Sequence, residues 1–592
     1  MIYALTMQEK THRRPVMKFK NQGKWNNGYR HDGLLFFAQK IEEMLGYYTS
    51  HLYKVPVYNS YFLMWEYLHV ARLVDGKVIN AGHLKYILDE FIESFENDIV
   101  IRNNISEDRM KYIIQRLNSS SELNQKMTIH YLYHYFANYH KMCAEFLKKI
   151  VKEEKEKKKI ERALRCYLPV LIGGGYSQEY IYYYCNEVFK NDQPGNFDML
   201  DTFLDRFDFR TRKYTVYVAM IKKVEQFKSV LENRLGAVVG EDDYSPKLKY
   251  DREKFFVTKF EVKQLDENKA AQQVYENINL FTRFYKFLGN RREEWFFKKC
   301  LVKDEEDNCV PLDLKPQGYS FSEDYDDRTI GIISEKMLTA LIETPHNTFY
   351  AIDNVLQIHN MAIENPDMKN AFLNLWSILE IIGVSKHDDN KMTEIEKSII
   401  PILQNDYSHN IFEELHDYIK ANISKKSYNE IMENVSEEGD DYFKIACIII
   451  LDKYDEERKK LYQILENYPL IRSRISQLNE LFRHKKTFLN DLDRYSRRLK
   501  WHLRRMYRTR NTIIHSGENP DNLKALGEHL HSYVDELLVE IIEQLTSEKR
   551  LGTIGNVLIA AEFDMDAIRA KFNSKEKLEI KDIRYLYNVG EN

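Results

Sequence analysis

Apolar residues recur at intervals of three and four positions along most of the chain, which is the period of an amphipathic helix. The pattern is plain from residue 34 to about residue 190. Its first members are Leu34, Leu35, Phe37, Ile41 and Leu45. It returns at Met337 and continues to about Leu545. We therefore expect a helical N-terminal region at 1–195, a second helical region at 331–548, and an unassigned tail at 549–592.

The pattern changes near residue 210 to short segments rich in β-branched and aromatic residues, which favour strands. These segments are Tyr214–Ala219, Phe255–Val262 and a hairpin that joins Leu301-Val302 to Cys309-Val310. The stretch Ala270–Phe287 between them has a helical period. A small α/β domain is expected within 196–330, ending in a linker at 311–329 that is rich in acidic residues.

Three apolar stripes mark the principal helices of the region 331–548. The first follows Pro366 and consists of Phe372, Leu375, Trp376, Leu379 and Ile382. The second lies in a long helix, from about Ile471 to Arg510 with a break near Arg483, and consists of Leu492, Tyr495, Leu499, Leu503 and Met506. The third follows Asn519-Pro520-Asp521 and consists of Leu523, Leu526, Leu530, Tyr533, Leu537, Ile541 and Leu545. The fold class expected is mainly α with a small α/β middle domain.

The composition supports this picture and narrows the class of protein. The 592 residues include only 12 Pro and 22 Gly, which argues against long disordered linkers. The formal net charge of −4 excludes a uniformly basic protein that coats nucleic acid. The six cysteines show no C-x2-C spacing, and the longest apolar run is too short for a membrane span. We expect a cytoplasmic protein without membrane contact.

One segment departs from this balance of charge. Between Arg483 and Arg510 there are eleven Lys or Arg against two Asp, a local charge of +9. Such an asymmetry is suited to a polyanion, so RNA is the expected partner. The candidate RNA-binding residues are Arg497, Arg498, Arg504, Arg505 and Arg508. The alternative is a surface helix whose arginines pair with acidic side chains.

The same helix ends in the sequence RTRNTIIHSG, in which Arg510 and Asn511 precede His515. An arginine and a histidine with four residues between them are a weak signal by themselves, and Arg497 with His502 forms a second such pair. The first pair differs from the second because polar Asn511 follows its arginine and Ser516-Gly517, which is typical of a helix end, follows its histidine. Residues five apart point about 140° from each other on a regular helix. A shared site therefore requires a distorted turn or a second subunit.

RNTIIHSG resembles the signature of the HEPN superfamily, and it looks closest to the Apea-like HEPN type of phage-defence proteins. The upstream segment LWSILEIIG, Leu375–Gly383, is similar to the first long helix of such domains, where an aromatic residue and a Leu-Glu pair are typical. The resemblance covers about 335–545. It implies a metal-independent endoribonuclease that works as a homodimer, without a cofactor, in abortive infection. The first 330 residues would then sense a phage-derived trigger or hold the nuclease inactive.

The chemistry of RNA cleavage fits the residue types of this motif. Attack by the 2′-hydroxyl needs a group that moves protons near neutral pH, which His515 could supply. Arg510 could hold the phosphorane, and Asn511 could bind the phosphate or orient the imidazole. Arg510 could instead pair with Glu380, which would support the site or be purely structural. The alternative function is a non-catalytic helical scaffold that binds RNA or protein.

Two other constellations carry weaker signals. His130 and His134 lie one helical turn apart, as zinc ligands do, but the neighbouring Tyr131, Tyr133, Tyr135 and Phe136 favour an aromatic core helix. Asp251 with the Glu261-Val262-Lys263 triplet is similar to the PD-(D/E)xK nuclease pattern, although no Pro-Asp precedes it. No metal is expected at the candidate catalytic site.

Overall fold

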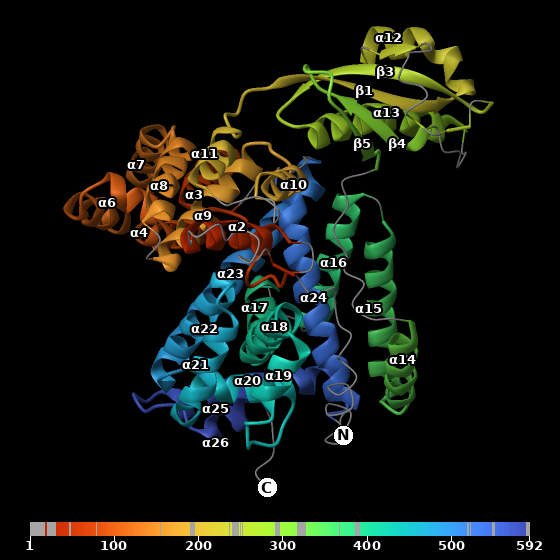
Figure 1. Ribbon diagram of the computed structural model, residues 1–592. Helices are drawn as coiled ribbons and strands as arrows, with labels where there is room; N and C mark the ends of the chain where they lie inside the picture. The colour runs from red at the N-terminus through yellow and green to blue at the C-terminus, as the bar shows by residue number, and fades with distance from the viewer. Residues whose placement is uncertain are drawn as a thin grey trace. The chain divides into compact units, whose positions relative to one another are not determined.

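The computed structural model describes most of the chain (Figure 1). The described residues are 18–19, 31–46, 49–77, 80–153, 156–189, 196–235, 237–239, 248, 250–251, 253–289, 296–315, 327–365, 367–384, 391–517, 520, 522–546 and 551–587. Most of the expected linker at 311–329 lies outside them, as do Pro366, Asn519 and Asp521. The fold of these residues is mainly α-helical with one small sheet, which confirms the expected fold class. Within the described helices, none combines the length and apolar character that crossing a bilayer requires.

The chain folds as two compact units that do not coincide with the expected domains. The larger unit comprises Met1–Cys166, Phe189–Phe197 and Tyr319–Asn592, and the smaller comprises Tyr167–Val188 and Asp198–Gly318. The two helical regions that we expected to be separate thus share one unit. Periodicity could not show this, because it reveals that a helix has an apolar face but not which other helix covers it.

The N-terminal helices of the larger unit are short and closely packed. They are α2 (Asp32–Leu45), α3 (Ser60–Asp75), α4 (Gly82–Asn97), α5 (Ile99–Asn104), α6 (Glu107–Ser119), α7 (Glu122–Tyr135), α8 (Tyr139–Lys152) and the start of α9 (Lys157–Gly173). Helix α2 is buried from Gly33 to Leu45, charged residues included. A helix that is buried on all sides needs polar partners within the protein for those charged groups.

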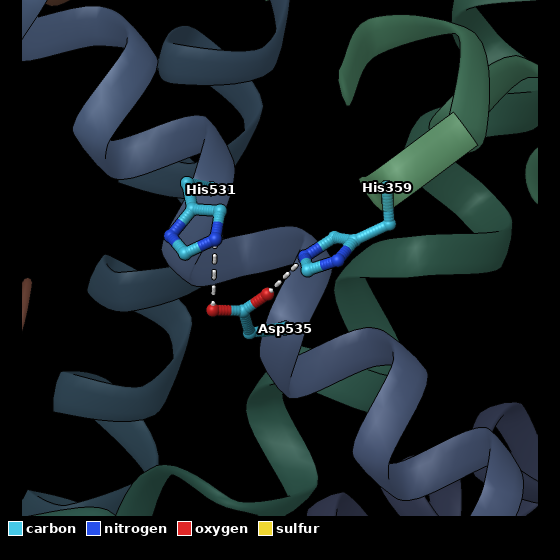
Figure 2. A group of neighbouring side chains, drawn as sticks. All are labelled: His359, His531 and Asp535. Atoms are coloured by element: carbon cyan, nitrogen blue, oxygen red, sulfur yellow. Dashed lines mark hydrogen bonds and ion pairs between the residues drawn. The ribbon is translucent and has the colours of Figure 1, made fainter. Parts of the chain in front are cut away.

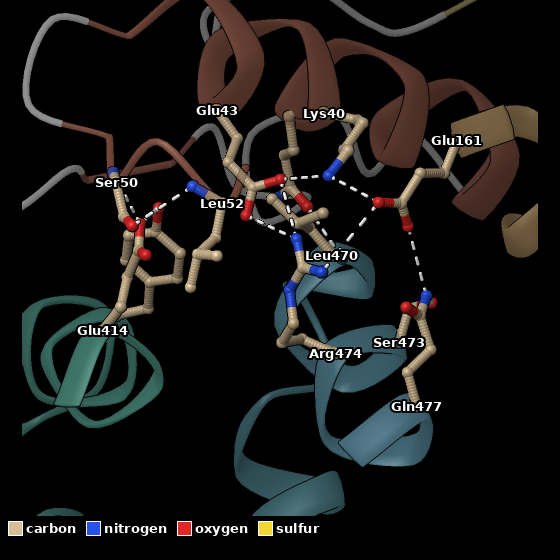
Figure 3. Close-up of polar contacts among 12 residues, drawn as sticks. Lys40, Glu43, Ser50, Leu52, Glu161, Glu414, Leu470, Ser473, Arg474 and Gln477 are labelled. Carbon is tan, nitrogen blue, oxygen red and sulfur yellow. Dashed lines mark hydrogen bonds and ion pairs between the residues drawn. The ribbon is translucent and has the colours of Figure 1, made fainter. Parts of the chain in front are cut away.

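These partners are Arg474 of helix α22 (Pro469–Leu481), far along the chain, and Glu161 of α9 (Figure 3). Arg474 donates to both carboxylate oxygens of Glu43, at 2.8 and 2.9 Å, and Lys40 also pairs with Glu43. Lys40 Nζ lies 2.9 Å from Glu161 Oε1 in α9. The Arg474 guanidinium stacks 3.7 Å above the ring of Tyr53. Two cations and two carboxylates thus neutralise one another inside the unit and join its N-terminal and C-terminal halves.

The C-terminal helices complete the larger unit. They are α14 (Asp327–Ile342), α15 (His346–Glu364), α16 (Met368–Gly383), α17 (Lys391–Asn405), α18 (Tyr407–Asn422), α19 (Lys425–Met432), α20 (Asp441–Ile450), α21 (Asp455–Ile464), α22 (Pro469–Leu481), α23 (Lys485–Ser516), α24 (Leu523–Thr546), α25 (Ile554–Phe572) and α26 (Ile580–Leu586), with a 3₁₀ turn, η4, at Asp452–Tyr454. Every residue of the three predicted stripes is buried. The predicted break near Arg483 separates α22 from α23. The unassigned tail forms α25 and α26, and α25 packs on α17, α23 and α24.

The smaller unit is built around a five-stranded antiparallel sheet in the order β2-β3-β1-β4-β5. Its elements are α10 (Gln178–Val188), α11 (Phe197–Asp205), β1 (Arg212–Ile221), η2 (Lys222–Phe227), α12 (Lys228–Leu235), β2 (Ala237–Val239), β3 (Phe255–Gln264), α13 (Glu267–Gly289), β4 (Phe296–Lys303) and β5 (Cys309–Asp313). The predicted strands, hairpin and helix are all present. Alternate residues of the strands, such as Val216 and Phe260, pack with Val274 and Ile278 of α13 in one core. Pro311 is accommodated because β5 is an edge strand.

Candidate functional site at the end of helix α23

Arg510, Asn511 and His515 lie in the last two turns of α23, which ends at Ser516. Gly517 then takes a left-handed conformation, with φ of +67°, that favours glycine after a helix. The helix is regular across the motif, so the distorted turn that could have brought Arg510 to His515 is not formed. The two side chains therefore leave the helix about 140° apart.

The Arg510 guanidinium is anchored but keeps access to solvent. Its Nη1 donates to Asn511 Oδ1 at 3.1 Å, and its Nη2 lies 3.7 Å from Glu380 Oε2. The side chains of Arg510 and Glu380 are each 27% exposed. Glu380 is itself oriented by Trp376, whose Nε1 donates to Oε1 at 3.0 Å. The predicted proximity of Arg510 and Glu380 is therefore present, at a distance that leaves the guanidinium able to bind an anion.

His515 projects from the surface of the same helix end. Its side chain is exposed, and none of the described residues forms a hydrogen bond or ion pair with it. Lys369 of α16 lies nearby, because its Nζ donates to the Gly517 carbonyl at 2.9 Å. The helix end thus presents an accessible imidazole with a lysine next to its last carbonyls, where a cation also complements the helix dipole.

The second Arg/His pair has different surroundings. Arg497 is bound to Glu93 of α4 at 3.2 Å. The ring of His502 packs against His529, with centroids 5.2 Å apart, and its Nδ1 lies 2.9 Å from the Tyr533 hydroxyl. Burial, followed by the charge of the neighbouring His529, lowers the pKa of His502 well below its usual value. The two sequence patterns that looked alike thus differ in the structure: His515 is exposed, whereas His502 is half-buried and its ring is held by His529 and Tyr533.

Burial corrects the prediction that Arg504, Arg505 and Arg508 contact RNA. Each of the three is at most 7% exposed. Arg504 pairs with Glu396 and stacks 3.4 Å above Tyr86. These guanidinium groups lie inside the protein, where a phosphate cannot reach them without unfolding the contact.

Arg505 and Arg508 share one carboxylate, that of Glu66 in α3. Arg505 Nη2 lies 2.9 Å from Glu66 Oε2, and Arg508 Nη2 lies 2.7 Å from Glu66 Oε1. Arg505 also pairs with Glu90 of α4. Burial acts to raise the pKa of Glu66, but Arg505 and Arg508 outweigh it and lower that pKa to about 2. The alternative given for the basic helix, pairing with acidic side chains, therefore holds for these arginines, with partners distant in sequence.

Only part of the basic helix faces solvent. Arg494, Arg497 and Arg498 are exposed, and the first two have carboxylate partners in Asp491 and Glu93. The cationic surface available to a polyanion is therefore much smaller than the local charge of +9 indicates.

The two weaker constellations do not form convincing sites. The Nε2 atoms of His130 and His134 lie 3.3 Å apart on α7, but no third ligand among the described residues completes a metal cluster there. The expected aromatic core helix is also wrong, because Tyr131 and Tyr135 are exposed.

In the smaller unit, Glu261 is bound to Lys213 at 2.7 Å, and Asp251 to Lys254 at 3.5 Å. No hydrogen bond or ion pair in the described part of the chain joins Asp251 to Glu261 or Lys263. The described interactions therefore do not bring the residues of the PD-(D/E)xK pattern together in one site.

One polar cluster was missed by the sequence analysis. His359 of α15 meets His531 and Asp535 of α24, and all three side chains converge (Figure 2). The spacing of His531 and Asp535, one helical turn apart, is visible in the sequence. His359 lies far away in the chain, and nothing in the sequence connects it to that pair.

Comparison with known proteins adds no relative: no family model, no curated protein and no solved structure matches this chain. The resemblance to HEPN nucleases therefore remains a prediction from the sequence.

Proposed function

We propose that the chain is a metal-independent endoribonuclease of the HEPN type, with Arg510, Asn511 and His515 at its catalytic centre. The observation that carries the proposal is the contrast between the two Arg/His pairs of α23. His515 is exposed and Arg510 is partly exposed, whereas His502 is half-buried and its ring packs against His529. A catalytic imidazole must reach its substrate, and of these two His515 is the more accessible.

The proposed reaction divides the work between the two side chains. His515 takes the proton of the RNA 2′-hydroxyl as that oxygen attacks the adjacent phosphorus. The bond from phosphorus to the 5′-oxygen breaks, which leaves a 2′,3′-cyclic phosphate, and the departing 5′-oxygen takes a proton from water. Arg510, a permanent cation with several N–H donors, stabilises the charge on the phosphorane oxygens. Asn511 holds the guanidinium at 3.1 Å, and Glu380 approaches it from α16, so both are positioning residues for Arg510.

We propose that the site is completed by a second copy of the chain. Because α23 is regular, Arg510 and His515 of one copy diverge by about 140° and cannot face one phosphate together. A two-fold axis beside the helix end would place His515 of one protomer opposite Arg510 of its partner. Activity would then depend on assembly.

The proposed cellular role is the one that the resemblance to HEPN nucleases implies. The enzyme would act in the cytoplasm as an effector of anti-phage defence, with the remaining helices and the smaller unit receiving a phage-derived trigger. The buried pairs from Glu66 and Glu90 to α23 support a regulatory link, because they tie helices α3 and α4 to the helix that bears the motif.

Purified protein is expected to cut total RNA in the presence of EDTA, because the proposed chemistry uses an imidazole and a guanidinium and no metal. The measurement is fragment formation on a denaturing gel, with and without EDTA or added Mg²⁺. Binding of RNA without cleavage would favour the alternative function, a helical RNA-binding scaffold. An absolute requirement for Mg²⁺ would contradict the metal-independent mechanism.

The exposed arginines make a separate prediction about affinity. Arg497→Ser with Arg498→Ser is expected to weaken RNA binding and to flatten the plot of log affinity against log salt by up to about 1.4, since each phosphate contact to a single strand contributes about 0.7. The matched variant Arg504→Ser should instead destabilise the fold, because it leaves Glu396 buried without its main partner. Fluorescence anisotropy at several salt concentrations measures the slope. An unchanged slope would place Arg497 and Arg498 outside the RNA-binding surface.

A further inference from the structure

Three side chains outside the proposed catalytic centre form a group with the composition of a metal site (Figure 2). His359 Nε2 lies 2.8 Å from Asp535 Oδ1, and His531 Nε2 lies 3.3 Å from Asp535 Oδ2. One ligand atom from each residue lies within 4.8 Å of the other two. Two of the ligands share helix α24 and the third comes from α15.

The separations suit a transition-metal ion with little rearrangement. In a tetrahedral site with bonds of about 2.0–2.1 Å, two ligand atoms lie about 3.4 Å apart. Both measured separations are shorter than that value, the one from His531 only slightly. The rings of His359 and His531 are nearly parallel, with an interplanar angle of 20° and centroids 5.5 Å apart. Small side-chain rotations therefore suffice to bring both Nε2 atoms and one carboxylate oxygen onto one ion.

Accessibility and chemistry define which ion fits. The histidine side chains are 16% and 11% exposed, whereas that of Asp535 is 38% exposed. The ligands are thus held by packing on one side and open to solvent on the other, which leaves an entry path and a place for water. Two imidazoles with one carboxylate prefer Zn²⁺ and related ions over Mg²⁺ or Ca²⁺, which take oxygen ligands.

We propose that His359, His531 and Asp535 bind one divalent transition-metal ion of the Zn²⁺ class, with water as the fourth ligand. The ion links α15 to α24, the helix that follows the Arg510–His515 segment. The site is separate from the proposed ribonuclease chemistry and does not rest on it. It adds a cross-link between two helices of the larger unit.

The test uses the full-length protein, stripped with a chelator and dialysed, and zinc chloride titrated in competition with a chromogenic zinc indicator. The wild type is expected to take up about one equivalent of tightly bound zinc, and zinc should raise its melting temperature. The double variant His359→Ala/His531→Ala should lose this equivalent, and Asp535→Asn should bind at least tenfold more weakly. Mg²⁺ should not compete.

The matched control removes the other histidine pair, with His130→Ala/His134→Ala, and should retain the tight equivalent. If the double variant does not fold, His359→Gln alone supplies the same comparison from a partly exposed position. The proposal is overturned if the wild type takes up no stoichiometric zinc at micromolar concentration, or if the His359 and His531 variants bind it as tightly as the wild type. Because the readout is metal uptake, neither result bears on RNA cleavage.

Discussion

Replacing His515 with alanine is expected to lower the rate of RNA cleavage by about 10²–10⁴-fold, the range that a positioned general acid or base supplies. The side chain is exposed and has no bonding partner among the described residues, so its removal should leave the fold intact. Single-turnover cleavage of a labelled RNA measures the effect, and circular dichroism checks the fold. Cleavage by His515→Ala at the wild-type rate would show that the active site is elsewhere.

Two controls make this experiment specific. His130→Ala removes another exposed histidine, and His502→Gln removes the imidazole of the second Arg/His pair, so both variants should cleave RNA at the wild-type rate if they fold.

Mixing His515→Ala chains with Arg510→Ala chains tests whether two copies of the chain share one catalytic site. Heterodimers that combine one intact residue from each chain should regain part of the activity. A monomeric protein that cuts RNA at full rate would refute the two-fold arrangement and leave the role of His515 open to the single-variant test.

The sequence predicted the helices of this protein better than it predicted their partners. Stripes such as Phe372–Ile382 and Leu523–Leu545 are buried as expected, because an apolar face must be covered by something. The tail was missed because α25 has a weak apolar period and exposes Ile559 and Phe563. Its place in the bundle depends on α17, more than a hundred residues earlier.

The candidate site shows the same difference between local structure, which the sequence predicts, and packing partners, which it does not. The positions of Arg510 and His515 at a helix end could be read from Ser516-Gly517, and the helix break near Arg483 was also anticipated. The buried ion pair of Arg505 could not be predicted from the sequence, since its carboxylate partner Glu66 is 439 positions away. A basic segment in a sequence shows how many arginines are present. Which of them are buried in ion pairs depends on the fold.

Replacing Glu66 with glutamine is expected to lower the free energy of unfolding of the larger unit by about 3–5 kcal/mol, the cost of removing one partner from a buried ion pair. Glutamine keeps the size of the side chain but removes the charge that both Arg505 and Arg508 need. Two guanidinium groups, each at most 5% exposed, would then have Glu90 as their main remaining counter-charge. Denaturant titration followed by circular dichroism measures the loss.

The matched control is Glu93→Gln, which breaks the pair with Arg497 at the surface and should cost only about 0–1 kcal/mol.

The pH dependence of stability provides an independent check. The pKa of Glu66 is lowered from its ordinary value of 4.5 to about 2, so its contribution to stability is complete above pH 4.5 and is lost as the pH falls toward 2. Burial raises the pKa of the neighbouring Glu90, so that carboxyl takes up its proton first during acidification. The difference in stability between wild type and Glu66→Gln should therefore be largest near neutral pH and shrink below pH 4.5. A variant that loses less than about 1 kcal/mol at neutral pH would mean that the shared carboxylate does not hold α3 against α23.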